Sequence, residues 1–130
     1  ERQHLAQRYT EAFKNIEWLQ TPYDSSDSPH AYQSYPCLFC PEAVTNYNVE
    51  DISKQRNSWM ENLQSRGIST RPATHAVHML KFYSEKYGLK PTDFPKALIA
   101  NNCSISLPLY NGMSIEEQDY VIYSVLDSKF

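Results

Sequence analysis

The sequence predicts an α+β fold, in which helices pack against a small, mostly antiparallel sheet as a two-layer sandwich. The first and last segments carry apolar residues at helical spacing, which indicates amphipathic helices. Between them, short aromatic and β-branched runs are bounded by proline and glycine, as strands commonly are. In the middle of the chain, the order strand, helix, glycine, strand resembles a βαβ unit or a split version of it. A chain of 130 residues is long enough for one such domain and short for two.

The predicted elements follow one another with short connections. In chain order they are a helix over 1–13, strands over 17–20 and 30–39, a helix over 48–66, a strand over 68–71, helices over 75–87 and 96–102, a strand over 104–107, and a helix from 115 to about 127. A serine-rich polar loop is expected over 21–29, and connections over 41–47 and 91–95.

Three local signals fix parts of this assignment. Pro36 lies inside a predicted strand and implies a bulge or an edge, because proline cannot donate to the ladder. Gly67 follows the second helix, as a C′ glycine would. Ser114 and Glu117 have the spacing of a capping box and therefore start the last helix. The residues expected to face inward from that helix are Ile115, Val121, Ile122, Val125 and Leu126.

Composition excludes several classes of protein. Hydrophobic residues make up 41% and charged residues 21%, which is ordinary for a globular protein. The net charge of −3 argues against a nucleic-acid footprint, which requires clustered Lys and Arg. No apolar run approaches the ~20 residues that span a bilayer, and the charged helical opening predicts no signal peptide. Three cysteines make an odd count for a disulfide framework, so we expect reduced thiols and a cytoplasmic location.

The cysteines allow a weak metal or redox interpretation. Cys37 and Cys40, with Cys103 and His30, could supply a Cys3His zinc set. Alternatively, the Cys37-x-x-Cys40 pair could be redox-active. The pair lies in an apolar predicted strand, however, where buried cysteines commonly act as small hydrophobic side chains. We therefore expect no metal site.

A polar cluster between a predicted strand and a predicted helix is the strongest candidate binding site from residue types. It consists of Arg71, Thr74, His75 and His78. The planar guanidinium fork matches a carboxylate or phosphate, and histidines can donate to the same anion or to sugar hydroxyls. The His75-x-x-His78 spacing places both rings on one face if the segment is helical. Composition alone leaves open the other interpretation, a surface arginine beside a core histidine.

The lysines of the C-terminal half offer no obvious Schiff-base nucleophile. Such a lysine needs a desolvated pocket or a neighbouring cation to lower its pKa. Lys81, Lys86, Lys90 and Lys96 all lie among polar residues, and we expect them to be solvated.

The C-terminal segment carries a specific family resemblance. Residues 106–122 read SLPLYNGMSIEEQDYVI, which resembles the C-terminal signature of the DegT/DnrJ/EryC1/StrS aminotransferases, the perosamine synthetase-like enzymes. Asn111 stands where that family often has proline. The blocks HAYQSY at 30–35 and GIST at 67–70 also resemble family segments in order and spacing. The resemblance covers almost the whole chain but only the last third of a family member.

The resemblance implies the type I pyridoxal 5′-phosphate (PLP) transferase fold and a homodimeric, PLP-dependent parent enzyme. Such an enzyme transfers an amino group from an amino acid such as glutamate to a nucleotide-linked keto-sugar, in amino-sugar and polysaccharide biosynthesis. Residues 1–130 would be its C-terminal small domain, lacking the cofactor lysine, so this chain would hold no catalytic residue and be inactive alone.

The same resemblance gives the polar cluster a role. Arg71, Thr74, His75 and His78 would line a wall of the substrate cleft facing the parent's own large domain, and only His78 falls on a familiar family position. Three alternatives stay open. One is a free-standing α+β module that binds an anionic small molecule or a peptide without catalysis, and another is a small zinc or thiol-redox protein built on Cys37 and Cys40. The third is a degenerate family member that has lost catalysis.

Overall fold

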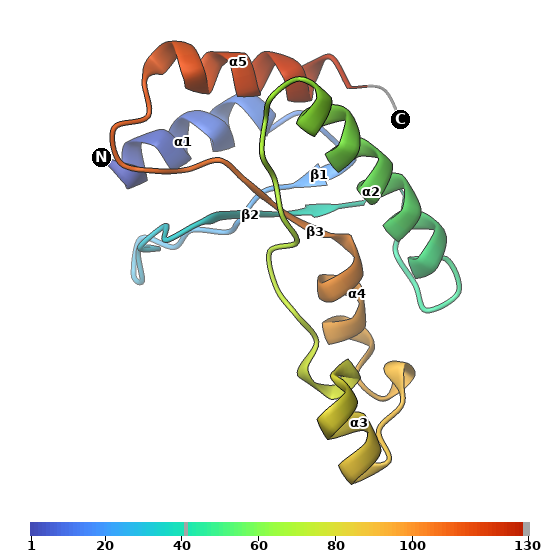
Figure 1. Ribbon diagram of the computed structural model, residues 1–130. Helices are drawn as coiled ribbons and strands as arrows, with labels where there is room; N and C mark the ends of the chain where they lie inside the picture. Colours follow the sequence, from blue (N-terminus) through green and yellow to red (C-terminus); the bar gives the residue numbers. More distant parts are fainter. Residues whose placement is uncertain (41, 129–130) are drawn as a thin grey trace.

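The computed structural model describes residues 1–40 and 42–128. A three-stranded sheet lies at the centre of the molecule (Figure 1). In that view the first and last helices lie above the sheet, the second helix lies at one end of it, and the remaining helices extend below it. The elements in chain order are α1 (Arg2–Phe13), β1 (Leu19–Gln20), β2 (Tyr35–Phe39), α2 (Val49–Ser65), the 3-10 turn η1 (Val77–Met79), α3 (Lys81–Tyr87), the 3-10 turn η2 (Pro91–Asp93), α4 (Pro95–Cys103), β3 (Ser104–Leu107) and α5 (Ile115–Leu126).

The sheet is antiparallel throughout, in the order β1-β2-β3. Leu19 pairs with Phe39, and Tyr35 pairs with Leu107 at the other end of β2. Because side chains alternate across a strand, Tyr35, Cys37 and Phe39 share one face with Ile105 and Leu107. All five are buried. Pro36, Leu38, Ser104 and Ser106 therefore occupy the opposite face, which we call the outer face.

The core lies between the inner face of the sheet and the helices α1, α2 and α5. The Tyr9 ring lies 5.0 Å from that of Tyr35, and the Tyr9 hydroxyl donates to the Pro108 carbonyl oxygen at 2.9 Å. The Trp59 ring of α2 lies 5.6 Å from that of Phe39. These aromatic contacts join α1 and α2 to the sheet.

Pro36 occupies the central strand, yet it has only one strand neighbour. β1 pairs with β2 only at Leu38 and Phe39, so Pro36 has no partner residue in β1. Pro36 itself pairs with Ser106 of β3. At Pro36, β2 therefore behaves as an edge strand, as expected, although it is the central strand elsewhere. The missing N–H of Pro36 leaves no acceptor of β1 unsatisfied.

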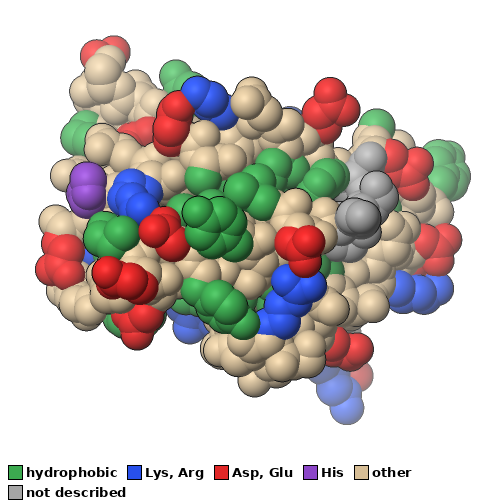
Figure 2. All heavy atoms as spheres, turned by 90° about the horizontal axis from the view of Figure 1, so that it is seen from above, with side chains coloured by type: hydrophobic (Ala, Val, Ile, Leu, Met, Phe, Trp, Pro, Cys, Tyr) green, Lys and Arg blue, Asp and Glu red, His purple; other side chains and the backbone are tan. Residues whose placement is uncertain are grey.

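The capping box is present. Ser114 Oγ accepts from the Glu117 amide at 3.1 Å, and the Glu117 carboxylate accepts from the Ser114 amide at 2.8 Å. The inward face of α5, however, differs from the expectation. Ile115 is 46% exposed and Leu126 49% exposed, because both lie at the margin of the buried stripe. Figure 2 shows apolar side chains at the surface on this side of the molecule. The buried stripe consists of Gln118, Val121, Ile122, Ser124 and Val125.

Gln118 is fully buried because its amide group is satisfied. Its side-chain amide donates to the Leu5 carbonyl oxygen at 2.7 Å, and its oxygen accepts from Arg8. These bonds join α5 to α1 through polar contacts inside the core.

Four expected elements are shorter or less continuous than the sequence suggested. The strand over 17–20 is reduced to Leu19–Gln20. The strand over 30–39 begins only at Tyr35, because Tyr32 has a positive φ of 48° that interrupts the extended chain. The strand over 68–71 reduces to one bridge between Arg71 and Ser106. The helix over 75–87 divides into η1 and α3, separated by Leu80 with an extended ψ of 133°.

Residues 77–94 form an arm that projects from the body (Figure 1). It contains η1, α3 and η2 and returns to the sheet through α4. At its base the His78 ring packs 5.0 Å from the Phe94 ring. Among the described helices, none combines the length and the hydropathy that a bilayer crossing requires.

Candidate functional site

An extended segment, residues 71–76, runs along the edge of β3, and three of its backbone groups form hydrogen bonds, one to backbone and two to side chains. Ser106 N donates to the Arg71 carbonyl oxygen at 2.7 Å. Ala73 N donates to Ser104 Oγ at 3.1 Å, and Ala76 N donates to Asn101 Oδ1 at 2.9 Å. The backbone is therefore anchored at alternate points to β3 and α4. The Arg71, Thr74 and His75 side chains remain exposed.

A buried arginine binds the backbone of Ser104, one of the residues that hold this segment. Arg56 of α2 is 5% exposed, and its Nη1 donates to the Ser104 carbonyl oxygen at 2.7 Å. Its Nε has no hydrogen-bond partner among the described residues. Burial lowers the pKa of the guanidinium group. Arg56 thereby connects α2 to the residue whose hydroxyl holds Ala73.

Arg71 and Thr74 line two hollows that lie along the outer face of the sheet. Arg71 lines a polar cavity of about 260 Å³, and Thr74 lines one of about 360 Å³. Ser34 lines both cavities. Hydroxyl groups dominate the surroundings of Arg71, from Ser34, Ser69, Thr70 and Ser106. A guanidinium beside several hydroxyls suits an anionic or polyhydroxylated ligand.

The two histidines are placed differently from one another. His75 is exposed and precedes η1, so it does not share a helical face with His78, contrary to the expected helix over 75–87. His78 is 7% exposed, and its Nε2 lies 3.0 Å from the Pro91 carbonyl oxygen. The His78 ring is thus part of the packing at the base of the arm, whereas Arg71, Thr74 and His75 reach the surface.

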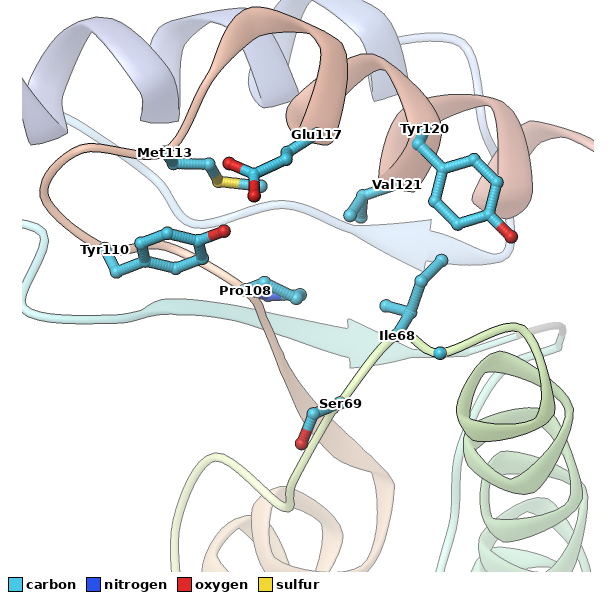
Figure 3. Close-up of a pocket in the computed structure, with 9 residues that line it drawn as sticks. Ile68, Ser69, Pro108, Tyr110, Met113, Glu117, Tyr120 and Val121 are labelled. Carbon is cyan, nitrogen blue, oxygen red and sulfur yellow. The ribbon is translucent and has the colours of Figure 1, made fainter.

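A third hollow, of about 440 Å³, adjoins the Arg71 cavity and shares Ser69 and Pro108 with it. Figure 3 shows it between α5 and the chain around Ile68. Its wall is largely apolar, with the Tyr110 hydroxyl and the Glu117 carboxylate on one side. Partial desolvation, followed by the nearby Glu117 carboxylate, raises the pKa of Tyr110. The three hollows form a surface that changes from apolar under α5 to polar at Arg71.

Several residues of this surface were not identified from the sequence. They are Ser34, Ser69, Asn101, Ser104 and Ser106. One signal was available, since SISL at 104–107 alternates serine with apolar residues and so predicts that the serines face away from the core. Nothing in the local sequence of Asn101 or Ser34 distinguishes them from other surface polar residues.

The surroundings of the cysteines within residues 1–40 and 42–128 differ from those of a metal or redox site. No group of three or more His, Cys, Asp or Glu side chains gathers there in a metal-binding arrangement. Cys37 and Cys103 are buried, and all three thiols are unpaired. Burial raises the pKa of Cys37 and Cys40, and that of Cys103 to about 11. A reactive thiol requires the opposite shift.

The described lysines do not fit a covalent PLP site. Lys14, Lys54, Lys81, Lys86, Lys90 and Lys96 are all exposed. A lysine that binds PLP as a Schiff base must be desolvated or placed beside another cation. The described part of the chain therefore supplies a candidate binding surface but no lysine suited to hold the cofactor.

Comparison with known proteins identifies the relatives of this chain. Residues 1–126 match the model of the DegT/DnrJ/EryC1/StrS aminotransferase family. The chain is 32% identical over 127 residues to the spore coat polysaccharide biosynthesis protein SpsC of Bacillus subtilis, covering 97% of this chain and 31% of SpsC. It is 31% identical over 124 residues to protein MJ1066 of Methanocaldococcus jannaschii, covering 95% of this chain and 30% of MJ1066. The chain thus spans about a third of the length of these relatives.

Solved structures share the fold at lower identity. Helicobacter pylori PseC, an aminotransferase of pseudoaminic acid biosynthesis, aligns with a TM-score of 0.78 and 19% identity over 96% of this chain and 31% of PseC. The PLP form of the sugar aminotransferase Spr1654 from Streptococcus pneumoniae aligns with a TM-score of 0.77 and 22% identity, over 95% of this chain and 29% of Spr1654. These alignments confirm the predicted α+β fold class as part of the type I PLP aminotransferase fold. The match of the family model over residues 1–126 shows that this chain belongs to the DegT/DnrJ/EryC1/StrS aminotransferase family.

Proposed function

We propose that residues 1–130 are the C-terminal small domain of a PLP-dependent sugar aminotransferase. The parent enzyme transfers an amino group from an amino acid such as glutamate to a nucleotide-linked keto-sugar, as perosamine synthetase-like enzymes do. Family membership and the relationship to SpsC, named for polysaccharide biosynthesis, support this proposal. The parent is a cytoplasmic homodimer, and the PLP-binding lysine belongs to its large domain.

The single observation that carries the proposal is the anchored segment 71–76. Its backbone is fixed by Ser104, Ser106 and Asn101, while the side chains of Arg71, Thr74 and His75 stay exposed. A cleft wall needs side chains held in place before the ligand arrives, because ordering them afterwards costs binding free energy. Arg71 binds an anionic group of the substrate, either the carboxylate of the amino donor or a phosphate of the sugar nucleotide.

The other members of the predicted wall have distinct parts. Thr74 and His75 offer hydrogen bonds to sugar hydroxyls from the exposed side of the segment. His78 holds the base of the arm through Pro91, and so fixes where the segment turns away from the sheet. PLP provides the electron sink of transamination when it is bound. This chain's own residues bind and orient the substrate.

The test uses the full-length gene product. We expect visible absorbance from bound PLP and transfer of an amino group to a nucleotide-linked keto-sugar. Arg71→Ala should raise the KM of one substrate about tenfold or more, which corresponds to a lost charge-assisted hydrogen bond of about 1.4 kcal/mol or more. Arg71→Lys is the matched control, since it keeps the charge and loses the bidentate fork.

Two results would contradict the proposal. One is a full-length product that binds no PLP. The other is an Arg71→Ala enzyme whose turnover and Michaelis constants for both substrates equal those of the wild type. A product that binds a sugar nucleotide without PLP would instead favour the free-standing binding module.

A further inference from the structure

The arm formed by residues 77–94 exposes an unusual amount of apolar surface. No residue of α3 is buried. Phe82 is 62% exposed and Tyr87 58% exposed, although both are large aromatic side chains. We define the arm surface as the exposed apolar residues Val77, Met79, Leu80, Phe82, Tyr83, Tyr87 and Phe94.

The arm surface is ordered by contacts within the arm. The Phe82 and Tyr83 rings pack edge-on at 5.2 Å, and the Tyr83 and Tyr87 rings stack at 6.4 Å. Lys86 Nζ lies 5.2 Å from the centroids of both the Phe82 and the Tyr87 rings. These contacts arrange the rings side by side but leave them in water.

A helix as short as α3 depends on packing against other elements for its stability. α3 has seven residues, and helices shorter than ~12 residues are marginal in water without tertiary packing. A group of exposed apolar side chains on one projecting element is typical of an interaction surface. The arm therefore has the properties of an element that is covered in the complete protein.

The length of the relatives indicates what covers it. The chain spans 30% of MJ1066 and 31% of SpsC. In each of these proteins, the polypeptide outside the matching region is therefore more than twice as long as the matching region itself. The extended segment 71–76 runs directly into η1. A second lobe that lies against the proposed cleft wall therefore lies beside the base of the arm.

We propose that the arm surface is the docking site for the rest of its own family-length polypeptide. This inference rests on the proposed function, since it takes the chain to be one domain of a longer enzyme. A tethered lobe is present at an effective concentration in the millimolar range, which favours it over a second copy for the same surface. The docking holds the arm, and with it residues 71–76, against the opposing lobe.

The first experiment compares one substitution in two contexts. The double variant Phe82→Ser/Tyr87→Ser is made in the 130-residue chain and in the full-length protein. In the 130-residue chain we expect the Tm to change by less than about 3 °C, because both rings are already in water. In the full-length protein we expect it to fall by roughly 5 °C or more, because two aromatic anchors are lost from an interface.

The control variant is Tyr47→Ser, whose side chain is 99% exposed outside the arm. It should leave the Tm unchanged in both contexts. Equal effects of the double variant in the two contexts would overturn the proposal, whether both effects are large or both are small.

The second experiment identifies the source of the covering surface. Backbone amide hydrogen exchange in residues 77–94 should be fast in the 130-residue chain and slowed at least tenfold in the full-length protein. The protection should persist through a hundredfold dilution. Absence of protection, or protection lost on dilution as a second copy would produce, overturns the proposal.

Bound PLP absorbance is measured in the same full-length sample. A protein with a protected arm and no bound PLP would contradict the proposed function and leave the docking proposal standing. A protein that binds PLP but leaves the arm unprotected would contradict the docking proposal and leave the proposed function standing.

Discussion

Arg56 Nη1 lies 2.7 Å from the carbonyl oxygen of Ser104, and both residues are buried. This bond joins α2 to the first residue of β3. Ser104 also accepts from Ala73 N through its hydroxyl. One buried cation therefore supports both the sheet and the proposed cleft wall.

The first prediction concerns the loss of this cation. Arg56→Ala should destabilise the chain by about 2–4 kcal/mol, because it leaves a buried carbonyl oxygen with one donor fewer and opens a cavity. Arg56→Met should cost less, since it fills most of the space and buries no charge. Urea unfolding gives the free energies directly.

The matched control is Arg66→Ala. Arg66 pairs with Asp127 at 3.1 Å in an ion pair at the surface, in which Asp127 is exposed and Arg66 partly exposed, and surface pairs contribute about 1 kcal/mol or less. Similar losses for Arg56→Ala and Arg66→Ala would show that burial adds nothing to the Arg56 interaction.

The sequence predicted those elements whose signals are local. The helix over 1–13, the strand over 104–107 and the capping box at Ser114 follow from periodicity and side-chain chemistry within a few residues. The reduction of the strand over 68–71 to a single bridge at Arg71 could not be predicted, because the bridge pairs Arg71 with Ser106, which lies far along the chain. Strand pairing over such separations leaves no periodic signal.

The candidate site was predicted in residue type but not in arrangement. Arg71 and Thr74 lie along neighbouring hollows, as a polar cluster suggests. His78 turns into the arm because Phe94 and the Pro91 carbonyl oxygen contact it from 13 or more residues later in the chain. Hydrophobic and polar contacts of that range depend on the tertiary fold, which residue spacing does not specify.

The second prediction tests the start of α5. Ser114→Ala should lower the free energy of unfolding by about 1 kcal/mol, because the Glu117 amide loses its side-chain acceptor. Ser114→Gly should cost only a few tenths of a kcal/mol. Ser58→Ala, at an exposed position in the middle of α2, is the control and should be neutral or slightly stabilising. A larger loss for Ser114→Gly than for Ser114→Ala would contradict the capping role.

The third prediction concerns thiol reactivity. Cys37 and Cys103 are buried, and Cys40 is partly exposed. At pH 8 a chromogenic disulfide reagent should react slowly with Cys40 and hardly at all with the other two, because burial raises the pKa of each thiol. Denaturant should expose all three.

Cys40→Ser provides the check on this assignment. It should abolish the reaction of the folded chain and leave two thiols that react after unfolding. Rapid modification of the folded Cys40→Ser variant would mean that Cys37 or Cys103 is more accessible than its burial indicates.

The fourth prediction is a pH dependence that arises from the loop before β2. Asp24 accepts from His30 N at 2.9 Å and from the Tyr32 hydroxyl at 3.0 Å. The backbone bond from His30, followed by the Tyr32 hydroxyl, lowers the pKa of Asp24 in the folded state. Because the folded pKa is lower than the unfolded one, this stabilisation is present above the unfolded value of about 3.9 and is lost as pH falls through the folded value.

Thermal unfolding of Asp24→Asn between pH 2.5 and pH 7 tests this dependence. At pH 7 the wild type should have the higher Tm, and the difference should shrink as pH falls below about 4, because the wild-type carboxylate becomes protonated. Asp27→Asn, in the same loop, is the control. Among the described residues, the Asp27 carboxylate accepts one long hydrogen bond, from the Ser26 hydroxyl at 3.3 Å. A Tm difference that stays constant across the whole range would show that the charge of Asp24 contributes nothing, and that its hydrogen bonds hold the loop equally well in the neutral form.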